Sequence, residues 1–128
     1  MSALGPGEVA AMVVGGGLGA GARYVVDAFV QRGRGDAFPA GILIVNVTGS
    51  FLLGLVTGLG SVVAPAWMSI LGVGVLGGYT TFSTVMVETV LLAQRRRRDW
   101  AWVNLLVTLA AAVVAAAAGV GLGALVPR

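Results

Sequence analysis

The chain has no cysteine and no histidine, and it has few charged residues. The first two absences exclude disulfides, thiolate and imidazole chemistry, and the common zinc ligand sets. Charged residues make up 10% of the 128 residues, against about 25% in a soluble domain. The acids also lie far apart, with no two within one helical turn: Glu8, Asp27, Asp36, Glu88 and Asp99. We therefore expect a protein that is not an enzyme.

Apolar residues dominate what is present. They supply 58% of the chain, and the mean hydropathy is +0.98. A soluble chain of this size could not hide so much apolar surface from water. Four apolar segments have roughly the 20 residues that a helix needs to cross a bilayer: residues 9–30, 40–63, 67–93 and 100–126. The sequence predicts an all-α membrane protein, a single four-helix transmembrane domain over residues 1–128, whose first segment is a span and not a cleavable signal peptide.

Arginine is distributed unevenly between the two sides of this bundle. The first loop (31–39) and the third loop (94–99) lie on one side and hold six arginines: Arg32, Arg34 and Arg95 to Arg98. The opposite side holds only Arg128. The positive-inside rule places loops one and three in the cytoplasm and both termini outside. We interpret the basic run as a topology signal, so no nucleic-acid partner is expected.

Glycine supplies 21 residues, and several recur at a spacing of four. The pairs are Gly15–Gly19, Gly17–Gly21, Gly54–Gly58, Gly74–Gly78 and Gly119–Gly123. Small residues at this spacing let helices approach closely in lipid. We interpret the pairs as helix-packing contacts. Four helices alone form a bundle too thin for a water-filled path, which favours an oligomer.

A polar residue lies inside the second span. Asn46 falls within residues 44–50, Ile-Val-Asn-Val-Thr-Gly-Ser, and Ser50 shares its helical face. A membrane-buried amide is costly unless it is paired. Two interpretations stay open: Asn46 joins two helices through hydrogen bonds, or it lines the path of a solute.

The third span contains Gly-Gly-Tyr-Thr-Thr-Phe-Ser-Thr at residues 77–84. Two glycines followed by clustered hydroxyls predict a helix broken within the membrane, with carbonyls freed that can coordinate sodium. A kink satisfied by hydroxyl side chains is the alternative. The spacing also predicts that Thr80, Ser83 and Thr84 form one polar face.

Further polar residues occur at helical spacing. Asn104 and Thr108 share a face of the fourth span, either to bond another helix or to line a pore. For Arg23 and Asp27 two interpretations stay open: a local ion pair, or a vestibule that attracts anions. For Glu88 the two interpretations are a pairing across the bundle and a side chain that reaches the membrane interface.

The uncharged donors share one chemical property. Amide N–H and hydroxyl O–H groups can replace the water around a small anion. Phe82 can present its ring edge, the positive part of the aromatic quadrupole. A fixed cation in the path would hold an anion too tightly, because conduction needs weak binding. Neutral donors therefore fit a small, strongly hydrated anion.

Three motifs occur in order along the chain: residues 16–20 (Gly-Gly-Leu-Gly-Ala) leading to Arg23 and Tyr24, residues 45–51 (Val-Asn-Val-Thr-Gly-Ser-Phe), and residues 77–84 followed by Glu88. Together they resemble the small bacterial fluoride channels of the Fluc (CrcB) family, over nearly the whole chain.

The resemblance implies an antiparallel dimer with two fluoride pores in the bacterial cytoplasmic membrane, which exports fluoride passively and so lowers its toxicity. It also implies a structural sodium ion, not transported, held at the dimer centre by the main-chain carbonyls of Gly77 and Thr80. Arg23 and Glu88 match charged positions with a vestibule or structural role. The matching pore positions are Asn46, Phe82, Ser83, Thr84 and Thr108.

Two positions depart from the family pattern. Val85 stands where a second phenylalanine is usual, and Asn104 stands where a tyrosine is common. A homodimer of antiparallel chains also needs balanced loops, whereas this chain is biased six arginines to one. These features lead to the hypothesis that the chain pairs with a related subunit of opposite bias.

Two other functions are alternatives for a chain of this kind. A small multidrug-resistance transporter also has four spans, but needs an acid in the middle of its first span, where neither Glu8 nor Asp27 lies. A non-conducting partner subunit would need neither Asn46 nor a helix break.

Overall fold

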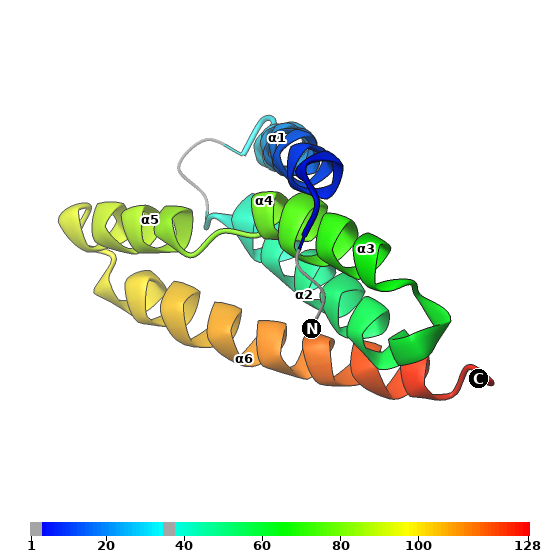
Figure 1. Cartoon of the computed structure of the whole chain (residues 1–128). Helices are drawn as coiled ribbons and strands as arrows, with labels where there is room; N and C mark the ends of the chain where they lie inside the picture. The colour runs from blue at the N-terminus through cyan, green and yellow to red at the C-terminus, as the bar shows by residue number, and fades with distance from the viewer. Residues whose placement is uncertain (1–3, 35–37) are drawn as a thin grey trace.

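The computed structural model describes residues 4–34 and 38–128, and all regular structure within them is helical (Figure 1). Asp36 and part of the predicted first loop lie outside the described residues. Four segments are long and apolar enough to cross a membrane: Pro6–Gln31, Ala40–Val62, Pro65–Gln94 and Arg98–Ala124. Each overlaps one predicted span, so the predicted all-α, four-span fold is confirmed.

Three of the spans are continuous. They are α1 (Pro6–Gln31), α2 (Ala40–Leu59) with the short 3-10 turn η1 (Gly60–Val62), and α6 (Arg98–Ala124). Pro6 starts α1, where its fixed φ suits a helix and its missing N–H is not needed. Gly60 ends α2 with a φ of +55°, a conformation that glycine adopts without strain.

The third span is interrupted near its middle. It consists of α3 (Pro65–Met68), the π-helix η2 (Ser69–Leu76), α4 (Gly77–Tyr79) and α5 (Ser83–Gln94). Residues 80–82 are not helical, and Thr80 is extended, with φ −77° and ψ 155°. Figure 1 shows this connection between α4 and α5. The predicted break is therefore confirmed.

Glycines let α1 lie directly against the first half of the third span. A Cβ atom on Gly19 would overlap the carbonyl of Val75, and one on Gly78 would overlap the carbonyl of Gly16. Gly74 likewise meets the backbone of Met12. Close backbone approach is the favourable term that small residues supply in lipid, where apolar side chains gain little from burial.

The same kind of contact joins α2 to α6, which run side by side (Figure 1). Cβ atoms on Gly54 and Gly58 would overlap carbonyls of α6, and Cβ atoms on Gly119 and Gly123 would overlap carbonyls of α2. The packing interpretation holds for these pairs. Gly17 and Gly21 make no such contact within the chain, because a Cβ atom on either would have no atom of the described residues within 4 Å.

Two glycines of α6 provide a matched test of this packing. Gly119→Ala places a methyl group against the Phe51 carbonyl, whereas Gly121→Ala adds the same group where no atom lies within 4 Å. We expect overpacking to lower the free energy of unfolding of G119A by about 1–3 kcal/mol. G121A should be neutral or slightly stabilised, because alanine is the better helix former. Equal melting temperatures in detergent would contradict the contact.

Candidate functional site

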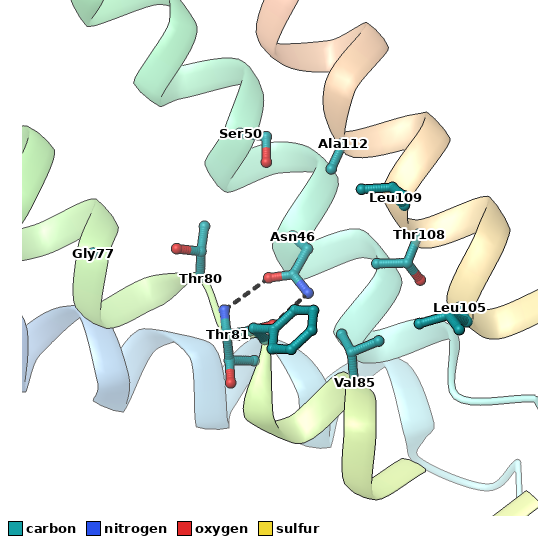
Figure 2. A pocket seen from close by; sticks show the side chains of 11 residues that line it. Asn46, Ser50, Gly77, Thr80, Thr81, Val85, Leu105, Thr108, Leu109 and Ala112 are labelled. Carbon is teal, nitrogen blue, oxygen red and sulfur yellow. Dashed lines mark hydrogen bonds between the residues drawn. The ribbon is translucent and has the colours of Figure 1, made fainter. Parts of the chain in front are cut away.

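The break in the third span is held by one side chain of α2. The Asn46 Nδ2 group donates a hydrogen bond to the Thr81 carbonyl at 2.8 Å, and the Thr81 N–H donates to Asn46 Oδ1 at 2.8 Å. Figure 2 shows the amide facing the backbone of Thr81. Asn46 is only 6% exposed. A buried amide and a buried, non-helical peptide unit thus satisfy each other.

Other hydrogen bonds fix the two ends of the break. On the α4 side, the Thr80 hydroxyl and N–H both donate to the Leu76 carbonyl. On the α5 side, the Thr84 N–H donates to Thr81 Oγ1 at 3.2 Å, as at a helix N-terminus. The predicted face of Thr80, Ser83 and Thr84 is therefore wrong, because the break separates Thr80 from the other two.

The break frees the carbonyls of Gly77 and Thr80 from their helical donors. In a continuous helix the Gly77 carbonyl would accept from the Thr81 N–H, and the Thr80 carbonyl from the Thr84 N–H. Those two N–H groups donate instead to Asn46 Oδ1 and Thr81 Oγ1. Gly77 and Thr80 are the two predicted sodium ligands, and their carbonyl oxygens suit a hard cation.

A cavity of about 480 Å³ lies beside the break and is open on one side. Its walls come from α2, the broken span and α6 (Figure 2). The lining residues are Asn46, Ser50, Gly77, Thr80, Thr81, Phe82, Val85, Leu105, Thr108, Leu109 and Ala112. The structure brings the predicted pore residues Asn46, Phe82 and Thr108 together here. Ser83 and Thr84 lie outside the cavity lining.

The cavity offers uncharged hydrogen-bond donors. Thr108 is 6% exposed, and its hydroxyl is the buried side-chain polar atom that finds no hydrogen-bond partner within residues 4–34 and 38–128. An asparagine amide carries two N–H donors, and Asn46 uses one of them on Thr81. The chain itself supplies no cation to this lining.

Phe82 stands at the open side of the site. Its side chain is 75% exposed although it lies at the middle of a membrane span and lines a polar cavity. An aromatic ring in this position is left uncovered by its own chain. The wall of the cavity is therefore incomplete in one chain.

A family model described as "CrcB-like protein, Camphor Resistance (CrcB)" matches residues 10–120. The chain belongs to the CrcB family. The match covers all three motifs of the sequence, so the family resemblance is confirmed.

Relatives of known name agree with this. Fluoride-specific ion channel FluC 1 of Leifsonia xyli subsp. xyli is 46% identical over 122 residues, which cover 94% of this chain and 89% of that protein. Fluoride-specific ion channel FluC of Shewanella baltica is 42% identical over 100 residues, with coverages of 77% and 79%. The protein of that name from Shewanella oneidensis is 44% identical over 91 residues, with coverages of 70% and 72%. These are names of ion channels and not of enzymes.

Asn104 has a different environment from Thr108, one turn away. In this CrcB chain the Asn104 amide donates to the Thr89 hydroxyl at 3.0 Å and more weakly to the Val85 carbonyl at 3.4 Å. Thr89 in turn donates to the Val85 carbonyl. Of the two interpretations, the structure places Asn104 in helix–helix bonding. Sequence reasoning missed Thr89, although its position four residues after Val85 permits the hydrogen bond from its hydroxyl to the Val85 carbonyl.

The charged residues of the first and third spans lie away from the cavity lining. Arg23 and Asp27 do not form an ion pair, so the predicted local ion pair is wrong; Arg97 and Asp99, in the third loop, do form one, at 3.2 Å. Asp27 packs instead against Gly41, at the positive end of α2. Glu88 is half-buried on α5.

The role of Asn46 in holding the break can be tested by Asn46→Leu, which keeps the size of the side chain but removes both hydrogen bonds to Thr81. Each buried backbone group left without a partner costs about 1–3 kcal/mol. We expect a lower melting temperature and faster hydrogen exchange of the Thr81 amide. The control is Thr48→Val, whose hydroxyl contacts Tyr79 at an exposed position. Unchanged Thr81 exchange in N46L would show that Asn46 does not hold the break.

Proposed function

We propose that this chain forms a fluoride-conducting pore through which fluoride leaves the bacterial cytoplasm passively, lowering its toxicity. The observation that carries the proposal is the cavity beside the helix break, in which the buried Thr108 hydroxyl has no protein partner within the described residues. An unpartnered buried hydroxyl costs stability unless a ligand or water meets it. The names of the FluC relatives support fluoride as that ligand.

The donors suit fluoride because they are neutral and fixed. Asn46 is held by Thr81, so its second N–H is oriented before an ion arrives. Such preorganised donors replace hydration without a reorganisation cost at the moment of binding. Phe82 supplies the positive edge of its ring. The anion is bound by several weak partners, from which it can leave.

We further propose that a second subunit completes the pore in an antiparallel dimer with two pores. The open side of the cavity and the exposed Phe82 ring support a partner at this face. In an antiparallel pair each chain presents its own break and its own cavity, which gives one pore for each subunit.

The identity of the second subunit follows from the two positions, Val85 and Asn104, at which this chain departs from the family pattern. Val85 is 3% exposed and packed inside the chain, and Asn104 is occupied by Thr89 and the Val85 carbonyl. Neither presents an aromatic group to a partner. With the six-to-one arginine bias, which supports loops one and three in the cytoplasm, these positions favour a related subunit of opposite orientation.

A structural sodium ion at the dimer centre is also part of the proposal. The support is the pair of carbonyls, Gly77 and Thr80, whose helical donors are diverted to Asn46 and Thr81. Bound there, sodium would supply the positive charge that satisfies both breaks where two chains meet.

The pore is tested by Thr108→Val in phospholipid vesicles loaded with fluoride. The variant keeps the shape of threonine and removes a hydroxyl that makes no hydrogen bond in the described structure. Loss of a hydrogen bond to an anion, worth about 1.5–3 kcal/mol, should slow fluoride efflux about tenfold or more while the melting temperature is unchanged. The control is Thr57→Val, whose hydroxyl binds only its own helix at Leu53.

The same assay tests selectivity and assembly. The full chain is reconstituted alone and together with a four-span relative of opposite arginine bias, and efflux of fluoride is compared with efflux of chloride. The proposal expects fluoride efflux that far exceeds chloride efflux, and faster in the pair. Robust fluoride efflux from the chain alone would contradict the pairing, and no fluoride efflux from either assembly would contradict the function.

Sodium binding is tested by the melting temperature of the assembled protein. A ligand present at 100 times its dissociation constant stabilises the folded state by about 2.7 kcal/mol. We expect sodium to raise the melting temperature more than choline at equal ionic strength. Asn46→Leu should weaken this response, because the non-helical segment that presents the Gly77 and Thr80 carbonyls is then no longer held in place by Asn46. An equal rise in melting temperature with sodium and with choline would exclude a bound structural sodium ion.

A further inference from the structure

A second cavity lies between α5 and α6 at the end of the bundle that carries the arginine loop. Its volume is about 270 Å³. It is lined by Thr89, Ala93, Arg98, Ala101, Trp102 and Leu105. Apart from Leu105, which also lines the first cavity, and Thr89, which bonds Asn104, these residues carry no role in the function proposed above.

The second cavity adjoins the first one. Leu105 lines both, so its side chain stands between them. Along α6 the lining continues on one helical face, because Arg98, Leu105 and Ala112 are spaced by seven residues. From Arg98 to Thr108 the helix rises about 15 Å. The two cavities are thus aligned along one face of α6, from the arginine loop to the unpartnered hydroxyl, with Leu105 between them.

The mouth of the second cavity carries a cation that the described chain does not neutralise. Arg97 binds Asp99 through two hydrogen bonds and lies 3.6 Å from the centre of the Trp100 ring. Asp99, the acid nearest to Arg98 in the sequence, is therefore engaged elsewhere. Within the described residues the Arg98 side chain forms no ion pair or hydrogen bond, and it is exposed.

The walls beyond Arg98 are apolar, with Ala93, Ala101 and Trp102 on either side. The Thr89 hydroxyl is already used, since it donates to Val85 and accepts from Asn104. A guanidinium beside low-dielectric walls concentrates anions at the mouth, where its field is less screened than on an open surface. An anion held there is still about ten helical residues from the neutral donors, so Arg98 does not trap it at the pore.

We propose that this cavity is the access site for a small monovalent anion, and that Arg98 draws in the ion, which then passes Leu105 to reach Thr108. The inference rests on the proposed function and adds the route and the residue that governs it. The alignment of this cavity with the one that holds the neutral donors favours an inorganic anion over a lipid, which would gain nothing from reaching Thr108.

The test compares Arg98→Gln with Arg96→Gln. Both remove one positive charge from the same loop and leave the same arginine balance, but Arg96 does not line the cavity. Each is reconstituted in neutral phosphatidylcholine vesicles, in whichever assembly conducts fluoride. The screening length is about 30 Å at 0.01 M salt and about 3 Å at 1 M. We expect R98Q to slow initial fluoride efflux several-fold at 0.01 M and to approach wild type at 1 M, with R98K close to wild type throughout and R96Q much less affected.

The outcomes separate the alternatives. Equal rates for R98Q and R96Q, or a loss in R98Q that salt does not remove, would overturn the access site while leaving the pore intact. An effect of R98Q seen only with phosphatidylglycerol in the vesicles would assign the cavity to a lipid headgroup and overturn it as well. No fluoride efflux from the wild-type protein would instead overturn the proposed function, and this inference with it.

Discussion

Two hydrogen bonds between the Asn46 amide and the Thr81 backbone are the interaction on which the rest of the structure depends. Lipid offers no water to a non-helical peptide unit, so a break inside a span survives only if protein groups satisfy it. The Asn46 side chain does this as a neighbouring backbone would, with one donor and one acceptor. Without it, the N–H and the carbonyl of Thr81 would lie inside the span with no partner from α2.

The features of the candidate site follow from this pairing. Because the Thr81 N–H is engaged by Asn46, the Gly77 carbonyl is released, and the end of α4 is separated from the start of α5. The gap places Phe82 on a non-helical turn at the open side of the cavity. Packing of α2 on α6 through glycine then brings Thr108 to the same cavity. One amide thus fixes several groups that are distant in sequence.

The spans and the break could be predicted because hydropathy and Gly-Thr clustering are local signals. The hydrogen-bond and packing partners of individual residues could not be predicted, because they depend on which faces of the helices meet. Asn104 and Thr108 lie four residues apart on the same face of α6, yet Asn104 bonds α5, whereas the Thr108 hydroxyl has no partner within the described residues. Gly15–Gly19 and Gly17–Gly21 have the same motif, but only the first lies against another helix. Rotation of a helix about its axis, which sequence spacing leaves open, decides each case.

The separation of Asn46 and Thr81 by 35 residues has a consequence for biogenesis. Chains are made from the N-terminus, so α2 reaches the bilayer before the glycine-rich part of the third span leaves the ribosome. The side chain that must satisfy the interrupted backbone is thus already in place when that backbone arrives. The order of the helices in the gene matches the order in which the nascent protein needs them.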